Sequence, residues 1–517
     1  MSRRRRRHFQ PVNSTHPKPT LFNRASRFIP LILVILAYFN VAAGSLFYPL
    51  DYDLGWHLKY GQDVVVNHVI SSTNTYSVEM PGYHWRNSSW LSDVLRYVLF
   101  YVFSFQGLMV AGVVTMVVTF FIFAKAARFS FWESALLFPI VVYMEFPLTS
   151  ASFRAQLLSF TGIGLVMWIV SVYEQGYKRA LVWLPPLFLV WANIHGGFFL
   201  GLVYFVAWSF LWIMQKVYLA NSERLSEALK RHGVPFTMAI LASVAFTLVN
   251  PWGTELYLEH VLVDIGTRFT KENPEQFLVE WKPLFTNTNL LLNHTVFGLF
   301  LLAGIFSLVW KKNIAKYLPI ALPVIILYLS SFYTRRFAWT TYFLALPLLG
   351  AAVSSVRPRQ WYLLYGIPLT VSLIFFGYVW HANLHNFMFF KTDWRVYCSL
   401  TGCSPESADY LVQNNLYNLS MYTTYDWGGW LIWNYPLIKP LVDGRMSTWI
   451  DDKGYSPFMS YVTYENNWKD INDSEYEVVY LSPGKRHIFN RMLDLVKENK
   501  WKIAYRDNNA FVFVRNK

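Results

Sequence analysis

The stretch FIPLILVILAYFNVAAGSLFYPL, residues 28–50, carries no charged side chain. About 20 mostly apolar residues in a helix are enough to cross the hydrocarbon core of a bilayer. The basic run SRRRRRH, residues 2–8, precedes this stretch, and such runs stay on the cytoplasmic side. No small-residue cleavage site follows the apolar stretch, so we expect it to be retained as a first span that ends on the outer side of the membrane.

The rest of the composition agrees with a lipid environment. The 517 residues are 54% hydrophobic and only 15% charged, whereas soluble domains usually carry about 25% charged residues. The chain is therefore predicted to be a polytopic α-helical membrane protein with about eleven transmembrane helices. The further spans are expected near residues 106–124, 132–149, 155–173, 180–194, 197–215, 235–250, 291–310, 316–332, 337–355 and 361–380.

Basic residues lie in every second connector, which fits a single threading through the membrane. This threading predicts a basic cytoplasmic N-terminus (1–27), a transmembrane domain (28–380) with a long first outer loop (51–105), and an extracytoplasmic C-terminal segment (381–517). The net charge of +14 does not indicate nucleic-acid binding, because the basic residues flank apolar segments.

The composition changes after about residue 381, where charged residues return and the apolar runs shorten. Strands are expected at 476–482, 501–507 and 510–516 around a helix at 486–498, which predicts a small α/β domain. Cys398 and Cys403 are the only cysteines. A structural disulfide is expected if this segment faces an oxidising compartment, with redox chemistry as the alternative.

Two carboxylates and a histidine follow the first span in DYDLGWH, residues 51–57. Asp53 and His57 share a face if this segment is helical, and Asp51 and Asp53 share one if it is extended. A carboxylate beside an imidazole can act as a general base for a hydroxyl, and Asp51 with Asp53 could hold a divalent cation such as Mg²⁺ or Mn²⁺. The alternative is that Asp53 caps the helix that follows it.

Other polar side chains gather at the same predicted boundary. Arg154 lies where a helix re-enters the membrane, and a planar guanidinium suits phosphate or carboxylate, although an arginine here can also anchor the topology. Arg335 and Arg336 can likewise bind an anion or anchor the topology. Anchoring explains them less well, because basic residues prefer the cytoplasmic side and these two are predicted to lie outside. Lipid pyrophosphate would account for them, and so would a salt bridge to Glu280 or to an aspartate of the first outer loop.

Five further residues are candidates for substrate binding, among them Glu280, which stands beside Trp281 in a predicted outer loop. Asn193 and His195 interrupt an apolar run and need polar partners, which a purely structural role could also supply. Asp443 and Arg445 stand among aromatic residues, as on sugar-binding surfaces, but they also fit an ordinary turn.

Together these stretches resemble the GT-C superfamily of integral-membrane glycosyltransferases. The resemblance covers nearly the whole chain and is closest to uncharacterised bacterial membrane proteins grouped with GT-C enzymes. It rests on DLGWHLKYGQ (53–62), WRNSSWLSDVL (85–95), FRAQLLSF (153–160), WANIHGGFFLG (191–201), NPWG (250–253), VEWKPL (279–284), YDWGGWLIW (425–433) and VDGRMSTW (442–449).

The resemblance implies transfer of a sugar from a polyprenyl-phosphate-linked donor to a glycan, lipid or protein acceptor on the outer face of the cell membrane. By position, Asp53 would be the acidic residue of the first outer loop, with Asp51 completing a DxD-like pair. Two other functions stay open, a lipid-linked sugar flippase and a non-catalytic envelope assembly protein. A transporter would be expected to carry charges near the membrane midplane, whereas here they lie at one face.

Overall fold

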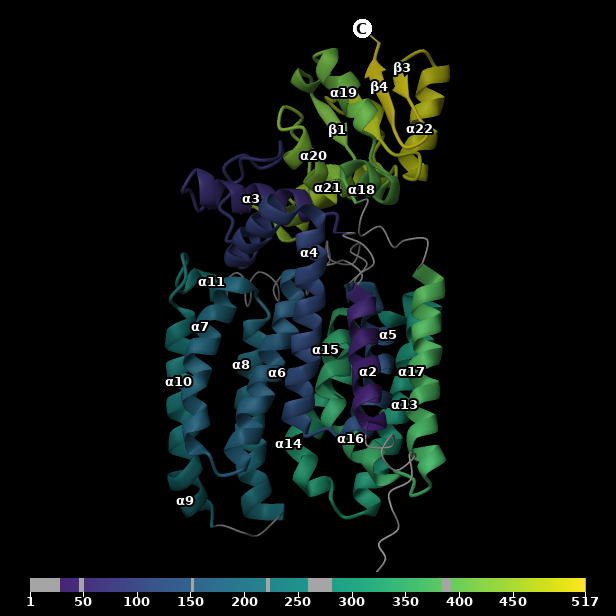
Figure 1. The fold of residues 1–517 in the computed structure, drawn as a ribbon. Coiled ribbons are helices and arrows are strands. Elements are labelled where there is room, and N and C mark those ends of the chain that lie inside the picture. Colours follow the sequence, from purple (N-terminus) through teal and green to yellow (C-terminus); the bar gives the residue numbers. More distant parts are fainter. Residues whose placement is uncertain are drawn as a thin grey trace, which may run out of the picture.

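The computed structural model describes residues 28–45, 51–149, 153–219, 224–258, 281–383 and 392–516. Figure 1 shows a bundle of long helices with a smaller mixed α/β part at one end, which we call the sheet end of the bundle. The segment 51–89 and the start of α4 lie between the two parts (Figure 1).

A helix occupies each of the eleven ranges in which the sequence predicts a span. Five of the described helices are long and apolar enough to cross a membrane, and a sixth is added if the bent pair α15 and α16 counts as one span. The total of eleven spans stays a prediction. The bundle contains α2 (Ile29–Ser45), α4 (Trp90–Ala127), α5 (Phe131–Thr149), α6 (Ala155–Glu174), α7 (Leu184–Ile194), α8 (Phe198–Met214), α10 (Val234–Thr247), α13 (Thr288–Trp310), α14 (Ile314–Ser330), α15 (Arg336–Leu344), α16 (Leu346–Ser355) and α17 (Trp361–Asn383).

Short helical turns complete this half of the chain. They are the 3-10 helices η1 (Lys178–Trp183) and η6 (Leu284–Thr286), the π-helices η2 (Gln215–Leu219) and η3 (Leu229–Gly233), and the short helices α9 (Leu225–Ala228) and α11 (Glu255–Leu258).

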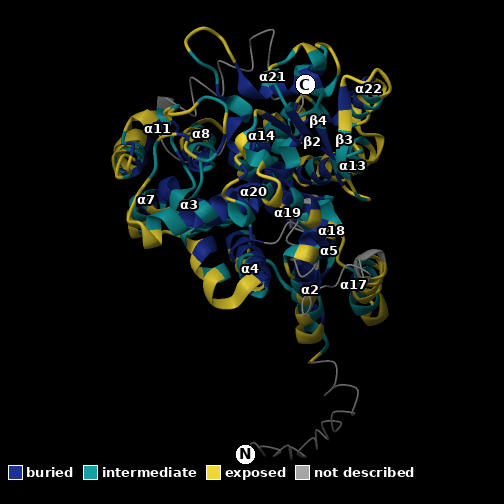
Figure 2. Ribbon diagram, turned by 90° about the horizontal axis from the view of Figure 1, so that it is seen from above, coloured by how far each residue is buried: buried dark blue, intermediate teal, exposed yellow. Residues whose placement is uncertain are grey.

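Apolar side chains cover both the inside and the outside of the bundle. In its core, the ring of Phe343 packs against the rings of Phe123 and Phe160, with centroids 5.2 and 4.7 Å away. On the periphery, Leu373 and Ile374 of α17 are 52% and 63% exposed, and Figure 2 shows the exposed faces of the outer helices around a buried centre. Apolar side chains on both faces are what a lipid environment requires.

Two breaks shape the helices. Helix α4 is interrupted at Ser104 (φ 55°, ψ −150°), so that residues 90–103 form a separate helical piece above the part that enters the bundle. Helices α15 and α16 meet at 44°, and Pro347 occupies the start of α16. A proline is favoured at that position because its missing N–H would have no partner there.

The first loop begins with α3 (Leu54–Val66), which packs against the first part of α4 and against α20. The contact with α20 is between backbones, because a Cβ placed on Gly55 would lie 1.9 Å from the carbonyl oxygen of Gly429. Glycine is required wherever two backbones approach this closely.

The C-terminal part is built on a four-stranded sheet in the order β1-β2-β4-β3. Strands β1 and β2 are parallel, and the other two pairs are antiparallel. The three predicted strands and the predicted helix are present, whereas β1 is an addition. The elements are α18 (Trp394–Thr401), α19 (Pro405–Gln413), η8 (Leu416–Asn418), β1 (Met421–Thr423), η9 (Tyr425–Trp427), α20 (Gly428–Asn434), η10 (Gly444–Thr448), α21 (Pro457–Glu465), η11 (Ile471–Asp473), β2 (Val478–Leu481), α22 (Arg486–Lys497), β3 (Trp501–Arg506) and β4 (Phe511–Arg515).

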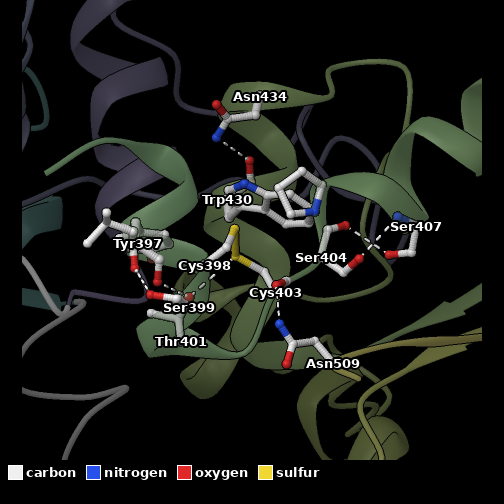
Figure 3. Close-up of a disulfide and its surroundings, with 12 residues drawn as sticks. Tyr397, Cys398, Ser399, Thr401, Cys403, Ser404, Ser407, Trp430, Asn434 and Asn509 are labelled. Atoms are coloured by element: carbon white, nitrogen blue, oxygen red, sulfur yellow. Dashed lines mark hydrogen bonds between the residues drawn. A yellow bond between two sulfur atoms is a disulfide. The ribbon is translucent and has the colours of Figure 1, made fainter. Parts of the chain in front are cut away.

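A disulfide joins Cys398 to Cys403, as the sequence predicts (Figure 3). Both cysteines are buried, and the turn between them passes through Gly402 at φ 74°. The carbonyl oxygen of Cys403 accepts a hydrogen bond from Asn509 Nδ2 at 3.3 Å. The disulfide therefore fixes the corner between α18 and α19 against the end of the sheet.

Candidate functional site

Asp51 stands at the centre of a buried ion-pair network at the sheet end of the bundle. Its Oδ1 accepts a 2.7 Å hydrogen bond from Arg154 Nη2, and its Oδ2 lies 3.6 Å from Arg96 Nη1. Its carbonyl oxygen accepts a hydrogen bond from the Tyr397 hydroxyl at 2.9 Å. Burial acts to raise the pKa of Asp51, but the charges of Arg154 and Arg96 prevail and hold that pKa below its ordinary value. Asp51 is therefore a carboxylate at neutral pH.

Asp53 is in a different electrostatic situation two residues later. It occupies the N-cap position of α3, yet its side chain makes no capping hydrogen bond, so the capping alternative is not realised. Its carboxylate lies against Gly444, where an added Cβ would come within 1.7 Å of Oδ1. Burial, reinforced by the negative charge of Asp51, raises the pKa of Asp53 to about 7. A carboxyl group with that pKa can take up and release a proton at neutral pH.

His57 is one helical turn further along α3 and contacts a buried carboxyl group. Its Nδ1 lies 2.6 Å from Asp93 Oδ1, and Asp93 Oδ2 accepts a hydrogen bond from Asn87 Nδ2, also at 2.6 Å. The indole of Trp56 stacks on the imidazole at 3.5 Å. Burial, together with the positive charge of Arg96, lowers the pKa of His57 well below its ordinary value. His57 is therefore a neutral imidazole whose orientation is fixed by Asp93.

Arg154 and His195 bring two further helices to this network. Arg154 directly precedes α6, and its side chain is 27% exposed, so the guanidinium reaches both Asp51 and the surface. His195 follows α7, and its Nδ1 lies 2.8 Å from Ser159 Oγ and accepts the N–H of Gly197 at 3.0 Å. His195 lies close enough to act electrostatically on His57. The structure thus brings Asp51, Asp53, His57, Arg154 and His195 into one neighbourhood, which we call the acidic-loop cluster.

Asn193 lies beside this cluster but is used to join helices. Its Oδ1 accepts a hydrogen bond from Trp90 Nε1 at 2.9 Å. Its Nδ2 donates to the carbonyl oxygens of Leu189 and Val249, both at 2.9 Å. These bonds tie α7 to α4 and to the residues after α10.

Arg335 and Arg336 contact the loop at residues 281–286. Arg335 Nη2 donates a 2.5 Å hydrogen bond to Thr286 Oγ1, and its backbone N–H donates to the carbonyl oxygen of Lys282. The guanidinium of Arg336 lies over the ring of Trp281 at 4.5 Å. Glu280, the acidic partner considered from the sequence, lies outside the described residues.

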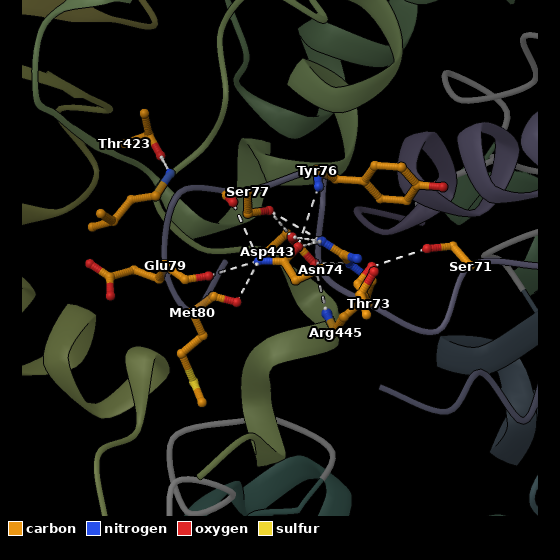
Figure 4. A network of polar contacts seen from close by, with 11 residues as sticks. Ser71, Thr73, Asn74, Tyr76, Ser77, Glu79, Met80, Thr423, Asp443 and Arg445 are labelled. Carbon is orange, nitrogen blue, oxygen red and sulfur yellow. Dashed lines mark hydrogen bonds and ion pairs between the residues drawn. The ribbon is translucent and has the colours of Figure 1, made fainter. Parts of the chain in front are cut away.

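Asp443 and Arg445 form a second buried network (Figure 4). Arg445 donates to Asp443 Oδ1 through Nε at 2.8 Å and to Asp443 Oδ2 through Nη2 at 2.7 Å. Nη2 also donates to Asn74 Oδ1 at 3.0 Å, and the Ser77 hydroxyl donates to Asp443. The Arg445 guanidinium lies over the ring of Tyr76 at 4.7 Å. We call this set, which joins the first loop to the C-terminal part, the clamp network.

No protein-family model and no curated protein matches the sequence. Solved structures do match. The archaeal oligosaccharyltransferase AglB from Archaeoglobus fulgidus, in complex with an inhibitory peptide and a dolichol-phosphate, matches with a TM-score of 0.55 at 12% sequence identity, over 95% of this chain and 75% of that one. This chain shares the fold of that oligosaccharyltransferase.

Two further oligosaccharyltransferase structures from the same organism give the same result. The apo form matches with a TM-score of 0.52 at 11% identity, over 95% of this chain and 75% of the other. A form tethered through a disulfide to an acceptor peptide with the NVT sequon matches with a TM-score of 0.55 at 10% identity, over 95% and 74%. The shared fold, together with the described helices that are long and apolar enough to cross a membrane, supports the prediction of a helical membrane protein.

The described residues do not fit a divalent cation at Asp51 and Asp53. Within the described ranges, no group of three or more histidine, cysteine, aspartate or glutamate side chains is arranged to hold a metal ion. Asp51 faces the positive charges of Arg154 and Arg96, which would repel a cation. The described part of the acidic-loop cluster is therefore built around ion pairs.

Asp93 and Arg96 contact the acidic-loop cluster, through His57 and Asp51, but the sequence motifs did not mark them as site residues. Both are almost fully buried, at 0% and 2% exposure. They break the apolar face of residues 90–103, and their spacing of three places them on one side of a helix. The sequence signal that could have marked them is a carboxylate and a guanidinium at this spacing on an otherwise apolar helix, directly after a loop with other acidic residues.

Proposed function

We propose that this protein is a membrane glycosyltransferase that moves a sugar from a polyprenyl-phosphate-linked donor to an acceptor on the outer face of the cell membrane. The fold shared with the archaeal oligosaccharyltransferase supports this proposal, as do the GT-C resemblance of the motifs and the dolichol-phosphate and acceptor peptide bound in the archaeal structures. The observation that carries it is Asp53, a half-buried carboxyl group that caps no helix and has a pKa of about 7.

In the proposed reaction, an acceptor O–H or N–H group attacks the anomeric carbon of the donor sugar. The bond from that carbon to the phosphate oxygen breaks, and its electron pair stays on the departing phosphate. Asp53 in its carboxylate form takes the proton from the acceptor. The products are the glycosylated acceptor and the polyprenyl phosphate or diphosphate. Since the sugar becomes cation-like and the phosphate gains negative charge, positive groups near the leaving oxygen lower the barrier.

Asp51, Arg96 and Arg154 have separate roles in this proposal. Arg96 is too buried to reach a substrate, so it holds Asp51 in its charged form. Asp51 in turn raises the pKa of Asp53 into the range where a carboxyl group is an effective base. Arg154 is the accessible guanidinium and contacts the departing phosphate, with His195 beside it.

The remaining candidates divide between binding and support. Arg335 and Arg336 would bind a donor phosphate at the adjoining loop. Asn193, Asp443 and Arg445 would position the cluster through the hydrogen bonds they make within the protein. The sidedness follows the charge distribution of the sequence, with the basic N-terminus cytoplasmic and the acidic-loop cluster outside.

The decisive test is Asp53→Asn in the full-length protein, incubated with radiolabelled polyprenyl-linked sugars. Asparagine has nearly the same shape but cannot accept the proton, so we expect the transfer rate to fall by about 10²–10⁴-fold. Asp494→Asn is the matched control, because Asp494 lies on the exposed face of α22 and pairs with the exposed Lys497. Its transfer rate should equal that of the unaltered protein.

Other outcomes would favour the alternative functions. If Asp53→Asn is folded and the protein moves labelled lipid-linked sugar across vesicle membranes without releasing the sugar from the lipid, a flippase is the better description. If neither release nor translocation depends on the protein, an assembly role is favoured and the glycosyltransferase proposal fails.

A further inference from the structure

A cavity of about 470 Å³ lies at the end of the bundle opposite the sheet. It opens where α4, α6 and α13 end and where α5 and α14 begin. Trp208 and Tyr204 of α8 form buried parts of its lining, and Met167 and Val170 of α6 contribute apolar side chains. This volume is in the range of small-molecule sites. The cavity is separate from the acidic-loop cluster.

Three cations line the cavity, and none of them forms an ion pair within the described part of the chain. Arg128 Nη2 donates to the carbonyl oxygen of Ser171, and Lys311 Nζ donates to that of Ser355, both at 3.4 Å. Within the described part of the chain, neither they nor Lys316 has a carboxylate within salt-bridge distance. All three side chains are exposed and can turn toward a bound anion.

Two carboxylates also line the cavity and must be counted against these cations. Glu133 is already occupied, since its Oε2 accepts from the N–H and hydroxyl of Ser130 and its Oε1 from the Ser354 hydroxyl. Glu174 accepts a hydrogen bond from Trp212 Nε1 at 3.1 Å. Three positive and two negative side chains leave the cavity lining with a net positive charge. The Glu133 carboxylate is already hydrogen-bonded to Ser130 and Ser354.

The Tyr204 hydroxyl is the second sign of a ligand. Tyr204 is 4% exposed, and among the described residues its hydroxyl has no hydrogen-bond partner. Buried hydroxyl groups are almost always paired, so an unpaired one in a cavity wall calls for a partner from outside the chain. A phosphate oxygen would accept its hydrogen.

We propose that this cavity binds the phosphate of an anionic phospholipid headgroup from the leaflet at this end of the bundle. Arg128, Lys311 and Lys316 supply the positive charge, and Tyr204 supplies a buried donor. A lipid is favoured over a free phosphate because apolar side chains adjoin the cations. Trp310, which immediately precedes Lys311, is 77% exposed, and Phe306 one turn earlier is 65% exposed. Acyl chains would cover this surface. The proposal does not depend on the glycosyltransferase reaction.

The test measures binding of phosphatidylglycerol to the purified full-length protein in neutral detergent, by native mass spectrometry and by the shift in melting temperature. Lys311→Gln combined with Lys316→Gln removes two charges, and we expect the affinity to fall about 30-fold, given the usual contribution of a lysine near anionic lipid. Tyr204→Phe should weaken binding several-fold. Lys312→Gln is the matched control, because Lys312 is exposed in the same connector but does not line the cavity.

Phosphatidylcholine, glycerol 3-phosphate and inorganic phosphate are the comparison probes. Weaker binding of all three, together with loss of phosphatidylglycerol in the double variant and in Tyr204→Phe, supports the proposal. If a soluble phosphate binds as tightly as phosphatidylglycerol and with the same dependence on the variants, the assignment to a lipid is overturned. If all variants bind phosphatidylglycerol like Lys312→Gln, the site itself is overturned. The melting temperature without lipid shows whether each variant is folded.

Discussion

The acidic-loop cluster and the clamp network are neighbours with opposite electrostatic designs. In the clamp network, the Asp443 oxygens face Arg445 donors and the Ser77 hydroxyl, and burial does not prevent a lowered pKa for Asp443. In the acidic-loop cluster, the guanidinium of Arg154 donates its hydrogen bond to Asp51, and the pKa of Asp53 is raised. Buried carboxylates that have all their donors stabilise a structure, whereas one deprived of them is prepared to exchange a proton.

The strongest test of this contrast is Arg445→Ala. The substitution would leave the fully buried Asp443 carboxylate without its partner, so we expect the free energy of unfolding to fall by about 3–5 kcal/mol. Thermal or denaturant unfolding in detergent measures the loss. Arg506→Ala, on the exposed end of β3, is the control and should change stability by less than about 0.5 kcal/mol.

The opposite result for Arg445 would reassign it. If Arg445→Ala unfolds like the unaltered protein and instead raises the KM for the donor or the acceptor, Arg445 binds substrate, as the sequence suggested, and the clamp network is part of the active site.

A smaller effect is expected at the point where the two networks touch. Gly444→Ala would place a methyl group 1.7 Å from Asp53 Oδ1, so the carboxylate must move. A displacement of about 1 Å at a catalytic group costs on the order of 100-fold in rate. Gly484→Ala is the matched control, since its Cβ would meet only Ser482 Oγ at 3.4 Å. Equal transfer rates for both variants would mean that Asp53 does not need its observed position.

The smallest effect concerns pH. In the proposed reaction Asp53 acts as the base in its charged form, so the transfer rate should rise with pH and level off above its pKa of about 7. The negative charge of Asp51 contributes to raising that pKa, so Asp51→Asn should lower it and move the rising limb to lower pH. The pH dependence of kcat/KM, measured for the unaltered protein and for Asp51→Asn, gives the position of the rising limb in each. An unmoved limb would show that Asp51 does not set the protonation of Asp53.

Apolar periodicity made the helices and most of the sheet predictable, because each predicted span or strand is a continuous run in the sequence. Strand β1 was missed because it has only three residues, Met421–Thr423, and depends on β2 for its pairing. Asp51, Asp53, His57 and Arg154 were found because each follows or precedes an apolar run. Their pairing could not be found, since Arg154 is 103 positions from Asp51.

The clamp network shows the same limit at a longer range. Arg445 and Asn74 are 371 positions apart, and only the folded chain brings them within 3.0 Å. Residue types at turns suggested sugar binding there, and that stays a prediction; in the folded chain three aromatic rings lie against the Arg445 guanidinium.

The backbone contact between Gly55 and Gly429 has a consequence for the history of the sequence. An added Cβ on Gly55 would meet the Gly429 carbonyl, and one on Gly429 would meet the Tyr52 carbonyl at 2.5 Å. Substitution at either position would press the two segments apart. The two glycines should therefore be retained together or lost together among relatives. In an alignment, relatives with both glycines would be those in which α3 still packs directly on α20.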